Sequence, residues 1–258
     1  MRSQPLSLLA CTVAIAAIAA CVGNIGEGDG STSGAGGGSQ PNAFTPAPSR
    51  LRKLTRTQYQ NSLRDLLGMV VELPKDALEE DSEKNGFTAI GASYVTLSAR
   101  GVEQYETAAM ALATKALADT TRRKALVGCN PTTVTDPTCT RAFVISFGRR
   151  AFRRPLTDTE TARWVGIAVD AQTKLTSFWE GLEIAVGGML TSPNCLYRVE
   201  LGEPDPAHPG RLRYSSLEMA SRLSYLLRNT TPDDALLDAA ERGELTSLEG
   251  VKAQVDRL

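Results

Sequence analysis

The chain has 258 residues, with 28 Lys and Arg against 29 Asp and Glu and a net charge of −1. This length is enough for one large domain or two modest ones, and the balanced charge argues against nucleic acid as a partner. The single histidine, His208, lies in a loop rich in Pro and Gly, so a histidine-rich metal site and a Ser-His-Asp triad are nearly excluded. No metal or other cofactor is therefore expected.

The first twenty residues have the features of an export signal. Arg2 supplies a positive charge, and the apolar stretch 6–20 is too short to span a bilayer comfortably. The sequence Ile18-Ala-Ala-Cys21 then resembles the bacterial lipobox, which implies that Cys21 carries a lipid and anchors the exported protein to the envelope. By the enterobacterial sorting rule, Val22 favours the outer membrane. An ordinary cleavage site with an incidental cysteine is the alternative.

Composition divides the mature part into a tether and a helical region. Residues 21–49 are mostly Gly, Ser, Thr, Asn and Pro and have almost nothing to bury, which predicts a disordered tether. After it we expect three helical modules, at 50–118, 119–193 and 194–258. The fold class is therefore predicted to be mainly α, a multi-helix array with one short β-hairpin.

Two helices are predicted in the first module. Thr55 and Gln58 form a capping box at the start of one, and Gly68 fits the position after its end. From Met69 to Leu97 the apolar residues have no lasting period, so a loop is expected there. The second helix runs from about Ser98 to Ala118. Its inward-facing residues are predicted to be Val102, Tyr105, Ala109, Leu112 and Ala116.

The loop contains a run of acids that a hydrolase could use as paired carboxylates, Glu79, Glu80, Asp81 and Glu83. Asp81-x-Glu83-x-Asn85-Gly86 also resembles the first half of a calcium loop. Ala92, however, occupies the position where such a loop needs its bidentate carboxylate. A solvated acidic turn is therefore the favoured interpretation.

Cys129 and Cys139 flank a short loop that contains two prolines, and neither has a nearby Cys-x-x-Cys or histidine partner for metal or haem. Because export would place them in an oxidising compartment, a disulfide between them is predicted. Cys195 is expected to be a free, buried thiol.

The most distinctive segment of the sequence is the stretch 147–160, which contains Arg149, Arg150, Arg153 and Arg154. Their spacing would gather them along one side of a helix, which Pro155 ends. Thr157 and Glu160 read as a capping box that opens the next helix. One interpretation of the arginines is an anion site. The favoured one is structural, with guanidinium groups tying helices together through carboxylates.

Further helices follow to the end of the chain, and a strand at 196–201 could pair with 211–214 across a Pro-rich loop. Capping signals predict helix starts at Ser215 to Glu218, Thr231 to Asp234 with Pro at the first helical position, and Thr246 to Glu249. The last helix carries an apolar stripe of Val251, Val255 and Leu258 with no closing signal, so we expect the third module to be truncated.

Four stretches, 54–68, 147–157, 192–200 and 220–237, resemble in this order a family of large secreted proteins built from consecutive domains of unknown function. These proteins are known from planctomycetes and myxobacteria, and relatives often carry a c-type cytochrome module. The resemblance implies that this chain is an N-terminal portion of such a protein. The chain has no Cys-x-x-Cys-His, so it cannot carry that haem itself.

Two functions follow as hypotheses. The favoured one is a non-catalytic helical scaffold or interaction module of the envelope, whose partners are the membrane, other envelope proteins or a cytochrome-bearing protein. The alternative is a secreted hydrolase that acts on an anionic polymer or glycan. A pocket with converging buried carboxylates would favour the hydrolase.

Overall fold

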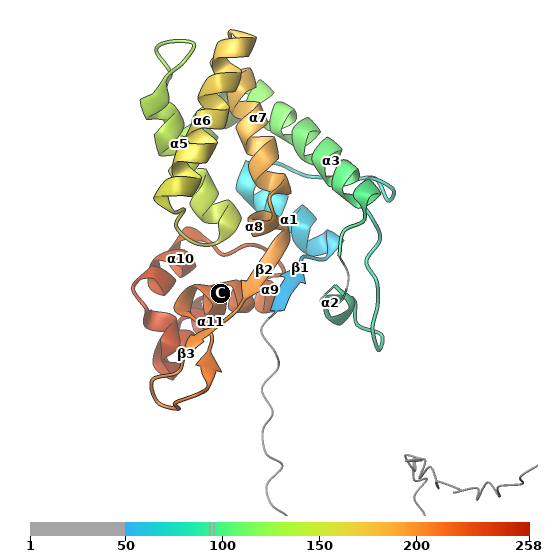
Figure 1. Cartoon of the computed structure of the whole chain (residues 1–258), viewed down its shortest axis with the longest axis vertical. Coiled ribbons are helices and arrows are strands. Elements are labelled where there is room, and N and C mark those ends of the chain that lie inside the picture. Colours follow the sequence, from blue (N-terminus) through green and yellow to red (C-terminus); the bar gives the residue numbers. More distant parts are fainter. Residues whose placement is uncertain (1–49, 93, 95) are drawn as a thin grey trace, which may run out of the picture. The chain divides into compact units, whose positions relative to one another are not determined.

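Helices dominate the part of the chain that the computed structural model describes, residues 50–92, 94 and 96–258 (Figure 1). This part contains eleven α-helices and two small antiparallel strand pairs, which confirms the mainly α fold class. None of its helices combines the length and the apolar character that a membrane span requires. The predicted signal 1–20, the lipid site Cys21 and the tether 21–49 lie outside the described residues.

The first half of the described chain runs from β1 to α7. Its elements are β1 (Arg50–Lys53), α1 (Arg56–Leu67), α2 (Thr88–Gly91), α3 (Ala99–Ala118), α4 (Thr120–Val127), α5 (Pro137–Phe152), α6 (Asp158–Leu175) and α7 (Phe178–Thr191).

The second half is made of shorter elements. They are α8 (Pro193–Leu196), β2 (Tyr197–Glu200), β3 (Glu203–Pro204), β4 (Leu212–Arg213), α9 (Ser216–Leu227), α10 (Asp234–Glu241), the 3₁₀ turn η1 (Glu244–Thr246) and α11 (Leu248–Arg257).

Local capping signals place many of these helices correctly. The boxes that begin with Thr55, Thr157 and Ser215 all form with both of their hydrogen bonds. Two predicted starts are wrong by one or two residues: Asp233 rather than Thr231 caps α10, and Ser247 rather than Thr246 caps α11. The cause is that Asp233 and Ser247 are themselves good capping residues, and each accepts a hydrogen bond from a backbone N–H three residues later.

The main core forms where α7 packs against both α3 and α6 (Figure 1). Small residues on α7 allow this close approach: a Cβ at Gly187 would collide with Met110 of α3, and one at Gly181 would collide with Gln172 of α6. Of the residues predicted to face inward on α3, Val102 is 52% exposed and was wrongly placed. It lies in the first turn of the helix, where Gly101 is the one buried residue before Tyr105.

A second and smaller cluster of buried residues lies in the C-terminal part. The helix α9 connects the two cores, because its Tyr225 belongs to the main core while its Ala220 and Leu223 belong to the smaller one. The smaller core consists of Ala220, Leu223, Leu236, Ala240 and Leu245.

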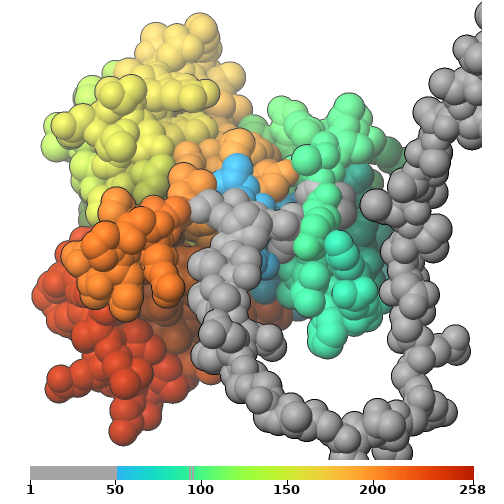
Figure 2. Space-filling view, turned by 60° about the horizontal axis from the view of Figure 1, so that its bottom comes forward, coloured from blue at the N-terminus to red at the C-terminus, as the bar shows by residue number. Residues whose placement is uncertain are grey.

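The strands pair differently from the prediction. Tyr197–Glu200 does form a strand, β2, but its partner is β1, with Arg52 opposite Arg198 and Lys53 opposite Tyr197. The predicted hairpin partner 211–214 contributes only β4, which pairs with β3 across the Pro-rich loop. In Figure 2 the blue residues of β1 lie between orange residues of the β2 region and the green residues of α3 and its preceding loop. The first strand therefore connects the N-terminal and C-terminal thirds of the described chain.

Candidate functional site

The arginine stretch begins at the end of α5, and the way this helix ends decides where the four guanidinium groups go. Arg153 adopts the left-handed conformation, with φ 58°, and its N–H donates to the carbonyl of Arg149. This turn sends the chain away from the helix axis before Pro155. The arginines therefore do not share one side of a helix, and that part of the sequence prediction is wrong.

Arg149 connects α5 to α10. Its guanidinium donates to three carboxylates, with distances of 3.2 Å to Asp234, 2.5 Å to Asp238 and 2.6 Å to Glu241. These acids recur at helical spacing and would repel one another on one face of α10 without a cation between them. The residue thus ties the C-terminal part to the main core.

Arg150 and Arg153 bind neutral oxygens instead of carboxylates. Arg150 Nη2 donates to the carbonyl of Asp65 at the end of α1, at 2.6 Å. Arg153 is only 4% exposed. Its donors reach the carbonyl oxygens of Asn194 and Tyr197 at 2.7 Å, those of Ala151 and Cys195 at 3.2 Å, and the hydroxyl of Tyr225 at 3.3 Å. Three of these carbonyls, those of Asn194, Cys195 and Tyr197, lie in α8 or directly after it, where so short a helix leaves carbonyls without intrahelical partners.

Arg154 forms a two-pronged pair with Glu160 in the first turn of α6, at 2.7 and 2.8 Å. Glu160 also accepts the N–H of Thr157 in the capping box. The hydrogen bonds from Arg154 and from this N–H lower the pKa of Glu160 to about 2. Among the four arginines, Arg149 and Arg154 thus match the predicted carboxylate pairing, whereas Arg150 and Arg153 do not.

The acidic run in the loop before α3 is divided among helix ends. Glu79 accepts the N–H of Ser98, the residue that caps α3, at 3.3 Å. Asp81 accepts the N–H of Arg56 at the start of α1, at 2.8 Å. Both carboxylates therefore lie where the positive end of a helix dipole favours a negative charge, while Glu80 and Glu83 are exposed.

The segment 81–86, which resembles the first half of a calcium loop, ends in a tight turn. Asn85 and Gly86 both have positive φ, and Lys84 and Phe87 are bridged across them by backbone hydrogen bonds. Across the described part of the chain, no three His, Cys, Asp or Glu side chains are grouped closely enough to hold a metal ion. The turn interpretation therefore accounts for this sequence.

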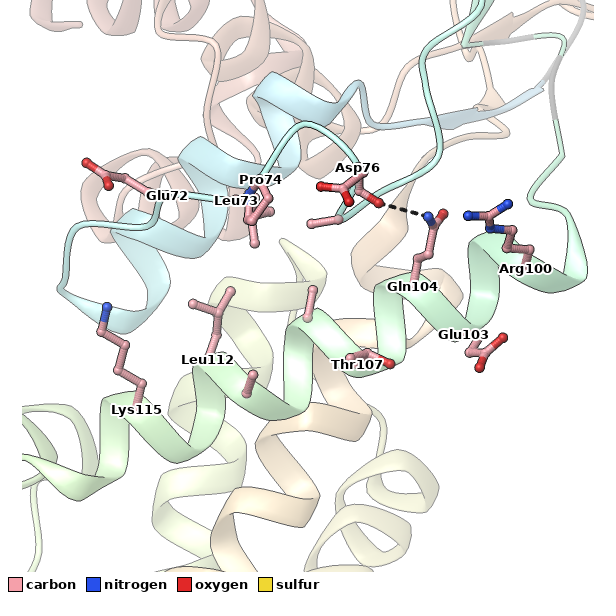
Figure 3. Close-up of a pocket in the computed structure, with 13 residues that line it drawn as sticks. Glu72, Leu73, Pro74, Asp76, Arg100, Glu103, Gln104, Thr107, Leu112 and Lys115 are labelled. Atoms are coloured by element: carbon pink, nitrogen blue, oxygen red, sulfur yellow. Dashed lines mark hydrogen bonds between the residues drawn. The ribbon is translucent and has the colours of Figure 1, made fainter.

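A groove of about 580 Å³ lies between α3 and residues 72–77 of the loop that precedes it (Figure 3). Glu72, Leu73 and Pro74 approach it from the loop, and the side chain of Gln104 on α3 donates to the carbonyl of Asp76 across it at 3.0 Å. None of the predicted site residues lines it. A neighbouring groove of about 370 Å³ includes Glu79 and Glu80 along its wall.

The predictions for Cys129, Cys139 and Cys195 agree with the structure. Cys129 and Cys139 form a disulfide between the end of α4 and the first turn of α5. Cys195 is a free, buried thiol, and burial raises its pKa to about 11. His208 is exposed in the loop between β3 and β4, where Nδ1 lies 2.8 Å from Asp205.

Two buried polar groups, Lys53 and Glu200, could not be predicted from the sequence. Lys53 is buried, and its ammonium lies 3.8 Å from Asp81 with no hydrogen-bond partner among the described residues. Glu200 is also buried, and three arginines surround it. No sequence motif marks either group, because the partners of each come from strands, helices or loops that are far apart in the chain.

Three family descriptions match successive parts of the chain. PSD3, Protein of unknown function (DUF1587), matches residues 52–118; PSD5, Protein of unknown function (DUF1595), matches 139–200; and PSD4, Protein of unknown function (DUF1592), matches 214–258. Neither the curated proteins nor the solved structures contain a match. The chain thus belongs to the family of proteins built from consecutive domains of unknown function, and it contains three of them, PSD3, PSD5 and PSD4 in that order.

Proposed function

We propose that this chain is a non-catalytic helical scaffold or interaction module of the cell envelope. The observation that supports this most directly is the use of the arginine stretch. Each of its four guanidinium groups binds oxygens of the same chain, and together they join α5 to α1, α6, α8 and α10. The most distinctive part of the sequence therefore connects the parts of the fold to one another.

The acidic run supports the same proposal over the hydrolase alternative. Glycosidases hold two carboxyl groups about 5–10 Å apart across a cleft, whereas Glu79 and Asp81 accept backbone N–H groups at two different helix ends. Glu79 and Glu80 share the wall of one groove, so they are the pair through which a secreted hydrolase of anionic polymers or glycans would act.

The proposal includes export and lipid attachment at Cys21, with residues 21–49 as the tether and the outer membrane as the destination. Its support is the lipobox-like sequence that ends at Cys21. The partners would then be the membrane, through the lipid, and other envelope proteins, including a cytochrome-bearing one. Cys21→Ser should move the protein from the detergent-extracted membrane fraction to the soluble fraction. Unchanged membrane retention of this variant would contradict lipid attachment.

A second experiment separates the scaffold from the hydrolase. The purified protein and its Glu79→Gln and Glu80→Gln variants should be assayed for release of reducing ends from a panel of acidic glycans. A scaffold predicts no turnover by any of them, and association with other envelope proteins in mild detergent. Turnover by the parent that either variant lowers by about 100-fold or more, the range of general acid–base catalysis, would establish the hydrolase instead.

A further inference from the structure

Lys53 occupies a position that a lysine rarely holds. It is the last residue of β1, and only 3% of it is exposed. Leu51 shares its face of the strand, because alternate residues point the same way, yet Leu51 is 53% exposed. One face of β1 thus buries an ammonium group and exposes a leucine. Because lysine is almost never fully buried unless it is paired, this position calls for a partner.

The side chain of Lys53 faces the carboxylate of Asp81. Its Nζ lies 3.8 Å from Oδ1, which is longer than a hydrogen bond. Both atoms are buried, and neither has a hydrogen-bond partner among the described residues. The two side chains are 2% and 13% exposed, so water screens their charges little. As a plain ion pair this arrangement is unfavourable, because two desolvated charges lack the hydrogen bonds that would compensate them.

Tyr105 on α3 encloses the carboxylate from another side. Its hydroxyl is also buried, without a hydrogen-bond partner in the described part of the chain. Burial raises the pKa of Tyr105, and the negative charge of Asp81 is the next cause of this rise. The phenol therefore lies close to Asp81, and the surroundings of the carboxylate include an aromatic ring as well as the lysine.

The second oxygen of Asp81 is held in a fixed position. Oδ2 accepts the backbone N–H of Arg56 at 2.8 Å, and Arg56 is the first residue of α1. The positive end of the helix dipole favours negative charge at this atom. A backbone N–H placed in this way also stabilises the oxyanion that forms when a nucleophile attacks a carboxyl carbon. Asp81 thus presents a polarised carboxyl group, with Oδ1 toward the lysine.

From this geometry we infer that Lys53 and Asp81 become joined by an intramolecular amide bond, an isopeptide. The bond between Nζ and Cγ of Asp81 forms, and the bond between Cγ and Oδ1 breaks. Of the three protons of the ammonium group, one stays on the amide nitrogen and two leave with Oδ1 as water. The reaction needs no oxidant, reductant or further reactant, and the fold supplies the proximity of the two groups.

The product suits this interior better than the ion pair does. An amide is uncharged, so its formation removes both the ammonium and the carboxylate from a buried place. Its oxygen, the former Oδ2, keeps the hydrogen bond from Arg56. The new bond ties β1 to the loop before α3 and restricts the unfolded chain as a disulfide does. The inference does not depend on the scaffold proposal.

Peptide mapping of the denatured full-length protein tests this bond. Trypsin cleaves after Lys and Arg, but not after a lysine whose amine is acylated. We expect one branched peptide that combines residues 53–56 and 76–84, with a mass one water below the sum of the two separate peptides. Fragmentation spectra should place the link between Lys53 and Asp81. The peptide 54–56, which requires cleavage after Lys53, should be absent.

Three variants accompany the parent protein. Asp81→Ala and Lys53→Arg should each abolish the branched peptide. Asp76→Ala is the matched control, because Asp76 is an exposed carboxylate in the same tryptic peptide, and its loss should leave the branched peptide unchanged. If Asp81→Ala or Lys53→Arg does not fold, the peptide map of the parent still decides the question, since it needs no variant.

A parent protein that yields peptides 54–56 and 76–84 separately, and no branched product, would overturn the inference. Lys53 and Asp81 would then be a buried ion pair. A link that fragmentation places at Glu79, Glu80 or Glu83 would overturn it as well, and so would a branched peptide that persists in Asp81→Ala.

Discussion

Arg153 lies in a conformation that residues other than glycine adopt rarely, and its contacts explain why it is tolerated. The positive φ directs the side chain into the turn between α7 and β2, where α8 leaves carbonyl oxygens without intrahelical partners. One guanidinium supplies several donors to these oxygens and to Tyr225. The strain at Arg153 is therefore balanced by hydrogen bonds that no shorter side chain could make.

Arg153→Ala should lower the free energy of unfolding by more than about 3 kcal/mol, because it leaves several buried oxygens unpaired. Urea denaturation followed by circular dichroism measures the change. Arg154→Ala should lower it by about 1 kcal/mol or less, since the pair with Glu160 is partly exposed. Arg141→Ala, at an exposed position of α5, serves as the control. Equal losses for the Arg153 and Arg154 variants would show that the carbonyl contacts contribute little.

Glu160 gives the structure a defined response to acid. Its pKa is lowered in the folded protein to about 2 by Arg154 and the capping N–H, below the ordinary value of about 4.3 for an unfolded chain. A carboxyl group of this kind stabilises the fold above its unfolded pKa, and this stabilisation is lost as the pH falls toward 2. Between pH 5 and pH 2, approximately, Glu160→Gln should therefore lose less stability than the parent.

Denaturation midpoints at a series of pH values test this response. Glu106→Gln, an exposed change on α3, is the control and should follow the parent curve. If the parent and Glu160→Gln curves stay parallel from pH 5 to pH 2, approximately, the pair with Arg154 does not contribute to acid sensitivity.

For whole helices and strands, the sequence predicts those features that contacts between nearby residues determine, such as where a helix starts. The three capping boxes form because their hydrogen bonds join residues three positions apart. The partner of β2 could not be predicted, because β1 lies almost 150 residues earlier and the short alternating pattern fits either partner. The helix α4 was missed, since only one of its eight residues is buried and its apolar period is weak.

The same distinction applies to the candidate sites. Arg154 and Glu160 are six positions apart, so their pairing could be anticipated from the helix start between them. Glu200 and Lys53 gained their partners only through the long-range strand pair and the packing of α9 and the loop. The structural role of the arginines could therefore be predicted from the sequence, whereas the partners of Glu200 and Lys53 could not.

The disulfide between Cys129 and Cys139 fixes the connection from α4 to α5. It closes a loop with a sequence separation of 10 residues, for which the chain-entropy account predicts about 2–3 kcal/mol of stabilisation. The Cys129→Ser/Cys139→Ser double variant should lose about that much stability in urea. Cys195→Ala is the comparison, because it alters a buried thiol outside the disulfide. A double variant as stable as the parent would show that the packing of α4 and α5 alone holds the loop.

For the whole folded part, the main question is how firmly the two cores are joined. The main core draws residues from Leu54 to Tyr225, while the smaller one has five buried residues on α9, α10 and η1. Several polar contacts join the two parts, among them those of Arg149 with the acids of α10, Asn61 with the carbonyl of Asn229, Thr230 with the carboxylate of Asp65, and Thr231 with the carbonyl of Arg150. The smaller core therefore depends on these contacts more than the main core does.

Hydrogen exchange measured by mass spectrometry should show α10 and α11 exchanging first and α3 and α7 last, because few apolar contacts protect the smaller core. Arg149→Ala should accelerate exchange in α10 and leave α3 unchanged, since Asp234, Asp238 and Glu241 would then repel one another on one helix face. Arg242→Ala is the matched control: it removes an exposed arginine next to α10 whose partner is the local Glu244. Equal exchange rates in α3 and α10 of the parent, or equal effects of the two variants, would mean that the whole folded part unfolds as one cooperative unit, with no special role for Arg149.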